Sequence, residues 1–432
     1  MSQQEASNII QIDPDTQYQE INGWGGAFTD TSGYNLNTLN KDARENVMRA
    51  YFSKDGIEYS LCRVPIGGSD LSPRYYSYDE VPGDVTLSKF NLTEEDYLYK
   101  IPFIKDAISL SNNSLKLMAS SWTAPLWMKT NNDSAGLGFL KKEYYQTWAD
   151  YHVKFLDAYK DYQIDFWGVT TGNEPIIGLS PFNDINSMGW LPWDQGTWIA
   201  DNFGPTLRKS NYSSIKIIAF DDNRILLPYW LLLEFATNKG MNYVDGLGMH
   251  WYTDSLIPAV MLDWTRFFYP NIFLLGTEAC AGDRRFKKKV VLGNWRRGEM
   301  YADSIIEDLE HWYTGWIDWN LAVNLKGGPS YIGNYVDSSI IVNSTAQEFF
   351  KNPTYYTMGH FSKFIPPKSV RIDANIKKKT VRVVAFRRPD NGTALVICNM
   401  HNRDVEVTIQ DPRRGYIRLP VRQRSIHTIL YW

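Results

Sequence analysis

Two glutamates in this chain could perform acid–base chemistry if the fold brings them together. Glu174 lies between Asn173 and Pro175, and Glu278 follows the apolar run Ile272–Leu275. A carboxyl pair can cleave a glycosidic bond: one group protonates the leaving oxygen, while the other attacks, or activates water at, the anomeric carbon. The glutamates are 104 positions apart, so the chemistry depends on how the chain folds. For either glutamate alone, a structural salt bridge is the alternative interpretation.

Polar and aromatic residues also follow the other short apolar segments. These residue types can accept sugar hydroxyls, cover a sugar ring or transfer protons. A simpler explanation is that strand ends are wetter than strand middles, but aspartate and tryptophan recur at many of these ends. The ends are Gly25–Asp30, Gly67–Asp70, Ser120–Trp122, Thr170–Pro175, Asp221–Asn223, His250–Tyr252, Thr277–Glu278 and Asp318–Asn320.

The elements that must position these residues alternate along the chain. Eight runs rich in β-branched and aromatic residues are each followed by a segment with helical periodicity. This alternation predicts an α/β fold built as a (β/α)8 TIM barrel. A doubly wound sheet is the alternative, but Gly23-Trp-Gly-Gly-Ala27 does not fit its glycine fingerprint. The predicted strands cover 21–29, 58–67, 115–122, 165–171, 215–220, 244–252, 271–277 and 316–321, and the predicted helices 40–52, 98–113, 141–162, 194–210, 227–241, 255–269, 297–313 and 353–364.

The pattern changes near residue 367, where strand-like runs follow one another without helical segments. Pro389-Asp-Asn-Gly392 between two such runs is a strong hairpin signal. We therefore predict a catalytic barrel over 21–366, with an insertion at 322–350 after its eighth strand, and a small antiparallel β-sandwich over 367–432. Residues 1–20 contain Ile9-Ile-Gln-Ile12 and are expected to add a strand to the sandwich.

Composition excludes several classes of protein. Lys and Arg total 45 against 48 Asp and Glu, so an electrostatic nucleic-acid binder is not expected. The six histidines are isolated and no Cys-x-x-Cys or His-Glu-x-x-His occurs, so no metal or other cofactor is predicted. The longest apolar stretch, Ile225–Phe235, is too short to span a bilayer, and no signal peptide is recognised at the start. Aromatic residues make up 15% of the chain, which suggests carbohydrate binding but also fits a large core.

Six Asn-x-Ser/Thr sequons are candidate glycosylation sites, although such triplets also arise by chance. They begin at Asn91, Asn112, Asn132, Asn211, Asn343 and Asn391.

Ordered motifs along nearly the whole chain resemble glycoside hydrolase family 30, and within it the enzymes that cleave glucosylceramide. Asn-Glu-Pro alone is a weak signal, but a series of motifs in the same order is a strong one. The motifs include Gly23–Asp30, Arg63–Pro65, Ser121–Trp127, Phe203–Leu207, His250–Tyr252, Glu278–Cys280, Trp316–Asn320, Asn334–Asp337 and Gly359–Ile365.

The resemblance implies a role for each matching residue. Glu174 matches the acid/base and Glu278 the nucleophile of the family, with Arg63 and His250 as supporting residues. The residues that match substrate-binding positions are Asp70, Trp122, Asn173, Tyr252, Trp319 and Asn334. Asn91 matches a glycosylation site of the family. Cys280 follows the nucleophile closely and is expected to be a buried thiol.

The resemblance further implies a retaining β-glucosidase that acts on a glucosylceramide-type glycolipid in the lysosome. A saposin-type activator and an anionic membrane surface are the partners that the family implies. Two alternatives remain: another family 30 β-glycanase, such as an endo-xylanase, or a glycan-binding relative without activity. The loop at Ile176–Asn183 matches the family only loosely, and about twenty residues precede the first barrel strand, fewer than in the family.

Overall fold

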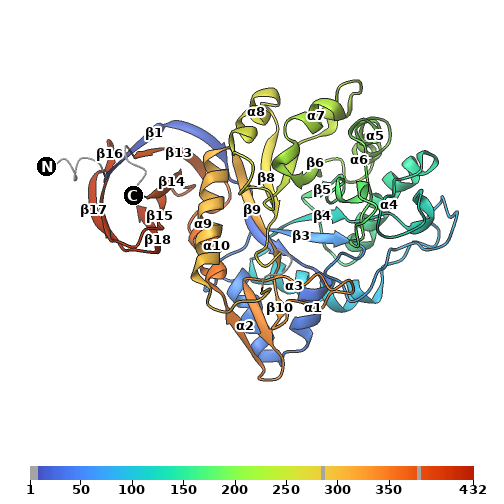
Figure 1. The fold of residues 1–432 in the computed structure, drawn as a ribbon, viewed down its shortest axis with the longest axis horizontal. Coiled ribbons are helices and arrows are strands. Elements are labelled where there is room, and N and C mark those ends of the chain that lie inside the picture. The colour runs from blue at the N-terminus through green and yellow to red at the C-terminus, as the bar shows by residue number, and fades with distance from the viewer. Residues whose placement is uncertain (1–7, 284–287, 377–380) are drawn as a thin grey trace.

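The fold is that of a computed structural model, which describes residues 8–283, 288–376 and 381–432. A barrel surrounded by helices fills the right-hand side of Figure 1, and a curved β-sheet lies at its left. The first seven residues of the predicted N-terminal segment lie outside the described residues.

Eight parallel strands close into a barrel in sequence order, which confirms the predicted (β/α)8 fold. The residues of these strands are almost all buried, because helices cover the outside of the barrel and side chains fill its inside. The barrel strands are β2 (Gly23–Ala27), β3 (Leu61–Ile66), β4 (Lys116–Ser121), β5 (Gly168–Thr170), β6 (Lys216–Asn223), β7 (Gly246–His250), β8 (Phe273–Glu278) and β9 (Tyr313–Asn320).

Helices between the strands form the outer layer. On α4 the buried Trp148, Tyr151, Phe155 and Tyr159 fall on one face, as their spacing predicted. The predicted helix over 194–210 is divided by a π-turn that precedes Pro205, a residue that cannot donate a helical hydrogen bond. The helices are α1 (Asp30–Asn37), α2 (Lys41–Phe52), α3 (Ile101–Leu110), α4 (Tyr145–Lys160), α5 (Pro192–Trp198), α6 (Gly204–Lys209), α7 (Tyr229–Glu234), α8 (Val260–Phe268), α9 (Trp295–Glu310) and α10 (Pro353–Ser362).

The second sheet has seven strands and combines both ends of the chain. Strand β1 lies between β16, with which it is parallel, and β13, with which it is antiparallel. Apolar residues from both halves of the sheet share one core, so the sheet folds over on itself as a sandwich does. In chain order the strands are β1 (Ile9–Glu20), β13 (Val370–Ile376), β14 (Arg382–Arg387), β15 (Thr393–Asn399), β16 (Val405–Asp411), β17 (Gly415–Val421) and β18 (Ser425–Tyr431).

Helices α9 and α10 join the sheet to the barrel (Figure 1). Alternate residues of β14 face different cores: Val383 and Ala385 belong to the sandwich core, whereas Val384 and Phe386 belong to the barrel core. This two-sided burial explains why β14 and β15 are continuous apolar runs, because neither face meets water.

Several elements were not predicted. Strand β17 contains Pro420, which argues against a central strand, but β17 is an edge strand, where proline is tolerated. Helix α1 carries Gly33 and has little helix propensity. Thr29 caps its N-terminus, because the Thr29 side chain accepts a hydrogen bond from the Ser32 N–H. The insertion after β9 also holds a small sheet, β10 (Val323–Asn324), β11 (Ile340–Asn343) and β12 (Glu348–Lys351).

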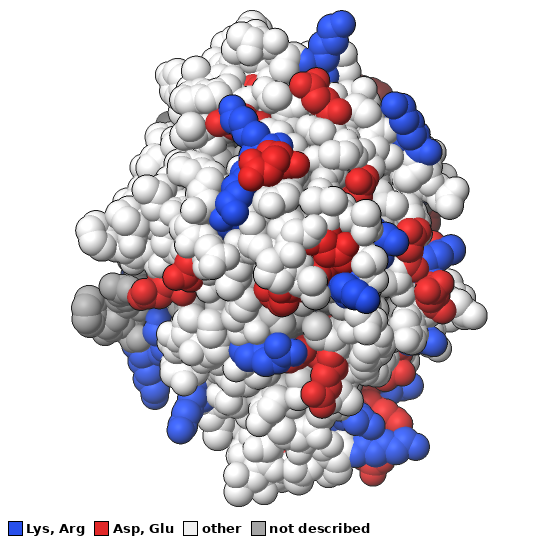
Figure 2. Space-filling view, turned by 90° about the vertical axis from the view of Figure 1, so that its right-hand side faces the viewer, with Lys and Arg blue, Asp and Glu red and all other residues white. Residues whose placement is uncertain are grey.

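The surface carries mixed charge. Figure 2 shows basic and acidic side chains interspersed over one face, as the nearly balanced composition predicts. Among the described residues, no helix combines the length and apolar character needed to cross a bilayer.

Candidate active site

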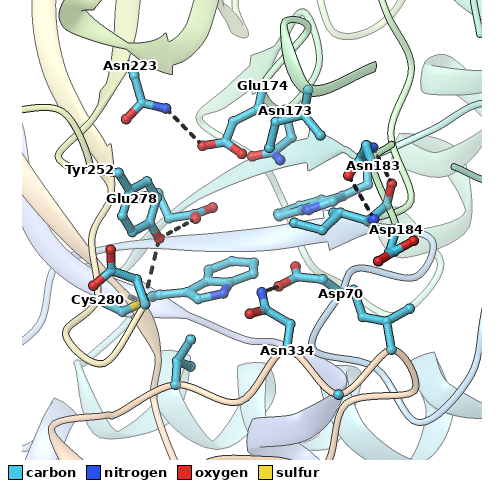
Figure 3. A pocket seen from close by; sticks show the side chains of 18 of the residues that line it. Asp70, Asn173, Glu174, Asn183, Asp184, Asn223, Tyr252, Glu278, Cys280 and Asn334 are labelled. Carbon is cyan, nitrogen blue, oxygen red and sulfur yellow. Dashed lines mark hydrogen bonds between the residues drawn. The ribbon is translucent and has the colours of Figure 1, made fainter. Parts of the chain in front are cut away.

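A cavity of about 610 Å³ opens at the carboxyl ends of the barrel strands, where TIM barrels place their active sites. Both predicted catalytic glutamates line it, with their carboxyl groups pointing into the space (Figure 3). Every residue that the sequence predicted to bind substrate also lines this cavity, namely Asp70, Trp122, Asn173, Tyr252, Trp319 and Asn334.

Glu174 sits in a strained turn after β5. Its φ is 40°, a left-handed conformation that is uncommon for a residue with a side chain. The turn is held because the Glu174 N–H donates to the Asp221 carbonyl at 3.0 Å. The side-chain carboxylate is held as well: Glu174 Oε1 accepts a hydrogen bond from Asn223 Nδ2 at 3.2 Å and contacts His250 Nδ1 at 2.9 Å. These bonds fix the carboxyl group in one orientation toward the cavity.

Glu278 ends β8 and is held by two donors. The Tyr252 hydroxyl donates to Oε1 at 2.6 Å, and Arg63 Nη1 donates to Oε2 and forms an ion pair with it. Burial raises the pKa of Glu278 and the charge of Glu174 adds to that, and together they outweigh the lowering effects of His250, Arg63 and Tyr252. A carboxylate with two fixed donors on its flanks can attack only along the direction that remains open.

The two glutamates lie close together across the cavity. One carboxylate oxygen of each, together with a ring nitrogen of His250, falls within 4.8 Å of the others. In retaining glycosidases the two carboxyl groups are about 5–5.5 Å apart, whereas inverting enzymes need about 6.5–9.5 Å to admit a water molecule. The oxygens of Glu174 and Glu278 approach within 4.8 Å, which is closer than the inverting range, so the geometry favours retention.

Arg63 and Asp221 form a buried charge network beneath the glutamates. Arg63 is fully buried, and its Nη2 donates to Asp221 Oδ2 at 2.7 Å and to Asn173 Oδ1 at 2.8 Å. Asp221 also accepts hydrogen bonds from Ser120 and Thr277, each at 2.7 Å. Burial raises the pKa of Asp221, but Arg63, His250 and Ser120 outweigh burial and hold it well below its usual value.

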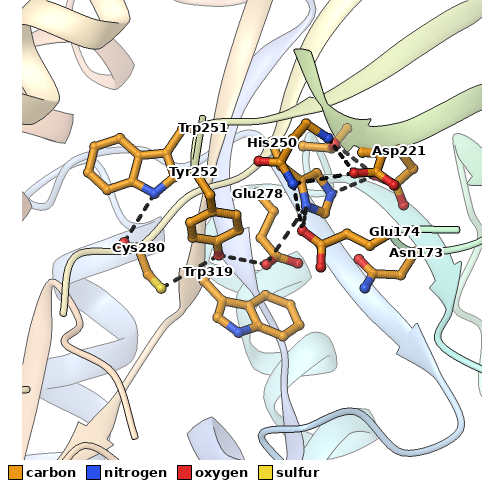
Figure 4. A network of polar contacts seen from close by, with 12 residues as sticks. Asn173, Glu174, Asp221, His250, Trp251, Tyr252, Glu278, Cys280 and Trp319 are labelled. Carbon is orange, nitrogen blue, oxygen red and sulfur yellow. Dashed lines mark hydrogen bonds and ion pairs between the residues drawn. The ribbon is translucent and has the colours of Figure 1, made fainter. Parts of the chain in front are cut away.

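His250 connects this network to Glu174 (Figure 4). Its Nε2 lies 3.2 Å from Asp221 Oδ1, so both ring nitrogens contact carboxylate oxygens. Burial lowers the pKa of His250, but Glu278, Asp221 and Glu174 outweigh it and raise the pKa to about 10. An imidazolium that donates two hydrogen bonds fits these contacts, and neither nitrogen is left to ligate a metal ion.

The far side of the cavity is suited to a sugar ring. Trp122 and Trp319 stack with their ring centroids 5.1 Å apart, and the Arg63 guanidinium lies over Trp122 at 4.8 Å. Asp70 Oδ2 accepts from Asn334 Nδ2 at 2.8 Å, which leaves polar atoms of both residues facing the space. Burial, followed by the charge of Glu278, raises the pKa of Asp70 to about 7.

No individual role was predicted for Asp221, Asp222 or Asn223. These residues end β6, so their position at a strand end was the available signal. Cys280 also lines the cavity, and its thiol is buried 3.6 Å from the Tyr252 hydroxyl.

None of the six sequon asparagines lines the cavity. Asn91, Asn112, Asn132, Asn211 and Asn391 are exposed, whereas Asn343 is half-buried in β11.

Comparison with known proteins assigns both parts of the fold. The family model described as "Glycosyl hydrolase family 30 TIM-barrel domain" matches residues 21–365, and "Glycosyl hydrolase family 30 beta sandwich domain" matches residues 368–429. The Mus musculus protein "Lysosomal acid glucosylceramidase" is 41% identical over 98% of this chain and 83% of its own length. The Caenorhabditis elegans protein "Putative glucosylceramidase 4" is 39% identical over 99% of this chain and 84% of its own length.

Among solved structures, SrfJ from Salmonella typhimurium superposes with a TM-score of 0.91 at 26% identity. The match covers 99% of this chain and 94% of that one.

Proposed function

Since this chain belongs to glycoside hydrolase family 30 and is a glycosidase, we propose that it hydrolyses the β-glucosidic bond of glucosylceramide with retention of configuration. The observation that carries the reaction type is the opposed pair Glu174 and Glu278, with carboxylate oxygens within 4.8 Å. Identity of about 40% to proteins named glucosylceramidases supports the substrate.

The reaction takes place in two displacements. In the first, Glu278 attacks the anomeric carbon while Glu174 gives its proton to the leaving oxygen, and the ceramide departs as an alcohol. In the second, Glu174 takes a proton from water as that water attacks the anomeric carbon. The ester bond to Glu278 breaks, glucose leaves, and both glutamates return to their starting states.

The surrounding network serves both displacements. Arg63 and Tyr252 hold Glu278 in place and stabilise its charge before attack. His250 donates to Glu174 Oε1, so the other oxygen of Glu174 is left to exchange a proton with the leaving group. Asn173 is placed to bind the sugar hydroxyl beside the anomeric carbon, a contact that strengthens in the transition state.

The sugar itself is bound on the opposite side of the cavity. Asp70 and Asn334 offer acceptors and donors to its hydroxyls, and Trp122 and Trp319 form an apolar wall. A cavity of about 610 Å³ has room for a glucose ring.

A mechanism-based β-glucoside inactivator tests the nucleophile. We expect digestion and mass spectrometry to find the label on Glu278, and none to attach to Glu278→Gln. A label on another residue, or a folded wild-type protein that is never labelled, would remove Glu278 from this role.

Replacement of Glu174 tests the acid/base. Glu174→Gln should lose activity mainly on substrates with poor leaving groups, because activated aryl glucosides depart without a proton. Azide should restore turnover of activated substrates by attacking the glycosyl-enzyme in place of water. Unchanged activity on a poor leaving group would contradict the assignment.

Substrate choice requires a separate assay. We expect glucosylceramide in vesicles to be hydrolysed faster than xylan or other β-glycans, and a chromogenic β-glucoside to be turned over. Preference for a polysaccharide would favour another family 30 activity, and absence of turnover would favour a glycan-binding protein.

We also propose a lysosomal location, with an anionic membrane surface and a saposin-type activator as partners. The mouse relative is named as lysosomal, and a glycolipid substrate is presented at a membrane surface. Stimulation of the vesicle assay by anionic lipid, and further by an activator, is the expected result; co-fractionation with lysosomal markers tests the location.

Occupancy of the sequons is a related proposal, because a lysosomal protein passes through the secretory route. We expect glycans on the exposed sequons, Asn91 first among them, and an intact-mass decrease after enzymatic deglycosylation.

A further inference from the structure

Asp222 is a buried carboxyl group beside Glu174 that the proposed mechanism does not yet use. A bulge in β6 places it there: the register with β7 shifts between Phe220 and Asp222, and Phe220 and Asp221 have φ of 74° and 48°. The bulge lets consecutive aspartates face different partners. Asp221 turns to Arg63, while Asp222, 2% exposed, turns to the segment that carries Glu174.

Two contacts tie Asp222 to Glu174. Asp222 Oδ2 accepts from the backbone N–H of Ile176 at 3.2 Å, two residues after Glu174. The side-chain amide of Asn223 bridges the two carboxyl groups, with Nδ2 3.2 Å from Glu174 Oε1 and 3.3 Å from Asp222 Oδ1. Asp222 therefore fixes the strained turn and also shares a hydrogen-bond donor with the carboxyl group in that turn.

The charges around this pair are unequally distributed. Asp221 is paired with Arg63, and Glu278 with the same guanidinium, whereas no described Lys, Arg or His forms an ion pair with Asp222. His250, from β7, lies against Glu174 and Asp221 and is the cation closest to the pair; Tyr252, Asp70 and Glu278 face Glu174 across the cavity. Burial, and then the charge of Glu174, raise the pKa of Asp222 to about 7.

We propose that Asp222 is a positioning residue for proton transfer, and that Glu174 and Asp222, joined through Asn223, act as one pair that retains the proton used by Glu174. Two neighbouring carboxyl groups resist losing their last proton because the doubly charged pair is repulsive. Of the two, Glu174 lines the cavity and reaches the leaving oxygen, whereas Asp222 does not line the cavity and acts only through Glu174. The proposal rests on the acid/base role of Glu174.

The first test is the pH profile of kcat/KM for Asp222→Asn on a β-glucoside with a poor leaving group. Asparagine keeps an acceptor oxygen for the backbone N–H of Ile176 but removes the second charge. The basic limb should therefore move to lower pH by about one unit, the size of a typical charge–charge effect. On an activated aryl glucoside, which needs no proton, kcat/KM should stay within a few fold of wild type. Asp42→Asn, an exposed change of the same charge on α2, is the matched control.

The second variant, Asn223→Leu, should shift the limb in the opposite direction. This variant keeps both carboxyl groups but removes the side-chain amide of Asn223, whose N–H groups stabilise the charged carboxylates. The pair should therefore hold its proton to higher pH. If Asp222→Asn does not fold, as judged by circular dichroism, this variant decides. A basic limb that stays in place in the folded variants, or that moves the same way in both, overturns the proposal.

Glu174→Gln in the same assays separates this proposal from the function it rests on. If Glu174→Gln loses activity on poor leaving groups and is rescued by azide while Asp222→Asn keeps the wild-type profile, only the role of Asp222 fails. If Glu174→Gln is fully active, the acid/base assignment fails first.

Discussion

At the residue scale, the nucleophile depends on donors that come from distant segments. Arg63 is contributed by β3 and Tyr252 by the loop after β7, and they reach opposite oxygens of Glu278. Arg63 also binds Asp221, Asn173 and Ser120, so one guanidinium orients groups from four strand ends. A planar fork of five donors can do this, whereas lysine offers one point of charge.

Tyr252→Phe should lower kcat/KM by about 10- to 100-fold. It removes a hydrogen bond to a charged group, which is worth about 1.5–3 kcal/mol, where each 1.36 kcal/mol is a factor of ten in rate. Most of the loss should appear in kcat, since Tyr252 contacts the reacting carboxylate. Steady-state kinetics on an aryl glucoside check this, with the exposed Tyr356→Phe as control. A change confined to KM would show that the hydroxyl serves binding instead.

At the element scale, α7 carries an unusual buried carboxyl group. Glu234 is fully buried, and neither of its oxygens accepts a hydrogen bond of normal geometry from the described residues, although Trp230 lies nearby. Burial raises the pKa of Glu234 well above its ordinary value, because the neutral carboxyl group is favoured over the charged one in this apolar site. In the unfolded chain the Glu234 carboxyl group is exposed to water and has the ordinary pKa of a glutamate.

Glu234→Gln should therefore flatten the pH dependence of stability. The group's favourable contribution is complete below the unfolded pKa of about 4.3 and is lost as pH rises toward the raised folded pKa. In thermal unfolding, the Tm of Glu234→Gln minus the Tm of the wild type should increase by at least about 2 °C between pH 4 and pH 8. Glu45→Gln, exposed on α2, should show a constant gap. A constant gap for Glu234→Gln as well would mean that the group does not ionise on unfolding in this range.

At the scale of the whole molecule, β1 makes the second sheet continuous. We propose that residues 1–20 and 367–432 form one unit beside the barrel of 21–366, including its insertion at 322–350. Strand β1 pairs on both edges, so without it β13 and β16 would lose their shared neighbour. The Ile21 N–H, at the start of the barrel, donates to the Ser369 carbonyl at 2.8 Å and links the two units again.

Ile10→Ala should destabilise the protein by about 2–5 kcal/mol, the usual range for emptying a buried aliphatic site. Ile10 is fully buried in the sandwich core, whereas its neighbour Gln11 points to solvent, so Gln11→Ala is the matched control. Differential scanning calorimetry should show a lower Tm for Ile10→Ala, with kcat at 25 °C unchanged because the cavity lies in the barrel. Equal effects of the two variants would contradict the assigned face.

The sequence by itself determined the order and type of most elements and the identity of the chemical groups. Periodicity is local, so eight strand runs and the stripe on α4 could be recognised, and motifs in order indicated the family. Elements with weak local signals were missed: β17 contains Pro420, and α1 forms because its buried face packs on its neighbours, not because of propensity.

Only the tertiary structure decided the distances and the charge states. The spacing of 104 residues between Glu174 and Glu278 contains no information about their approach to within 4.8 Å, which follows from barrel closure. The β6 bulge that separates Asp221 from Asp222 has no sequence signature, yet it gives one aspartate an arginine and leaves the other beside a glutamate. Burial and neighbouring charge then set opposite shifts of the pKa on two adjacent, chemically identical residues.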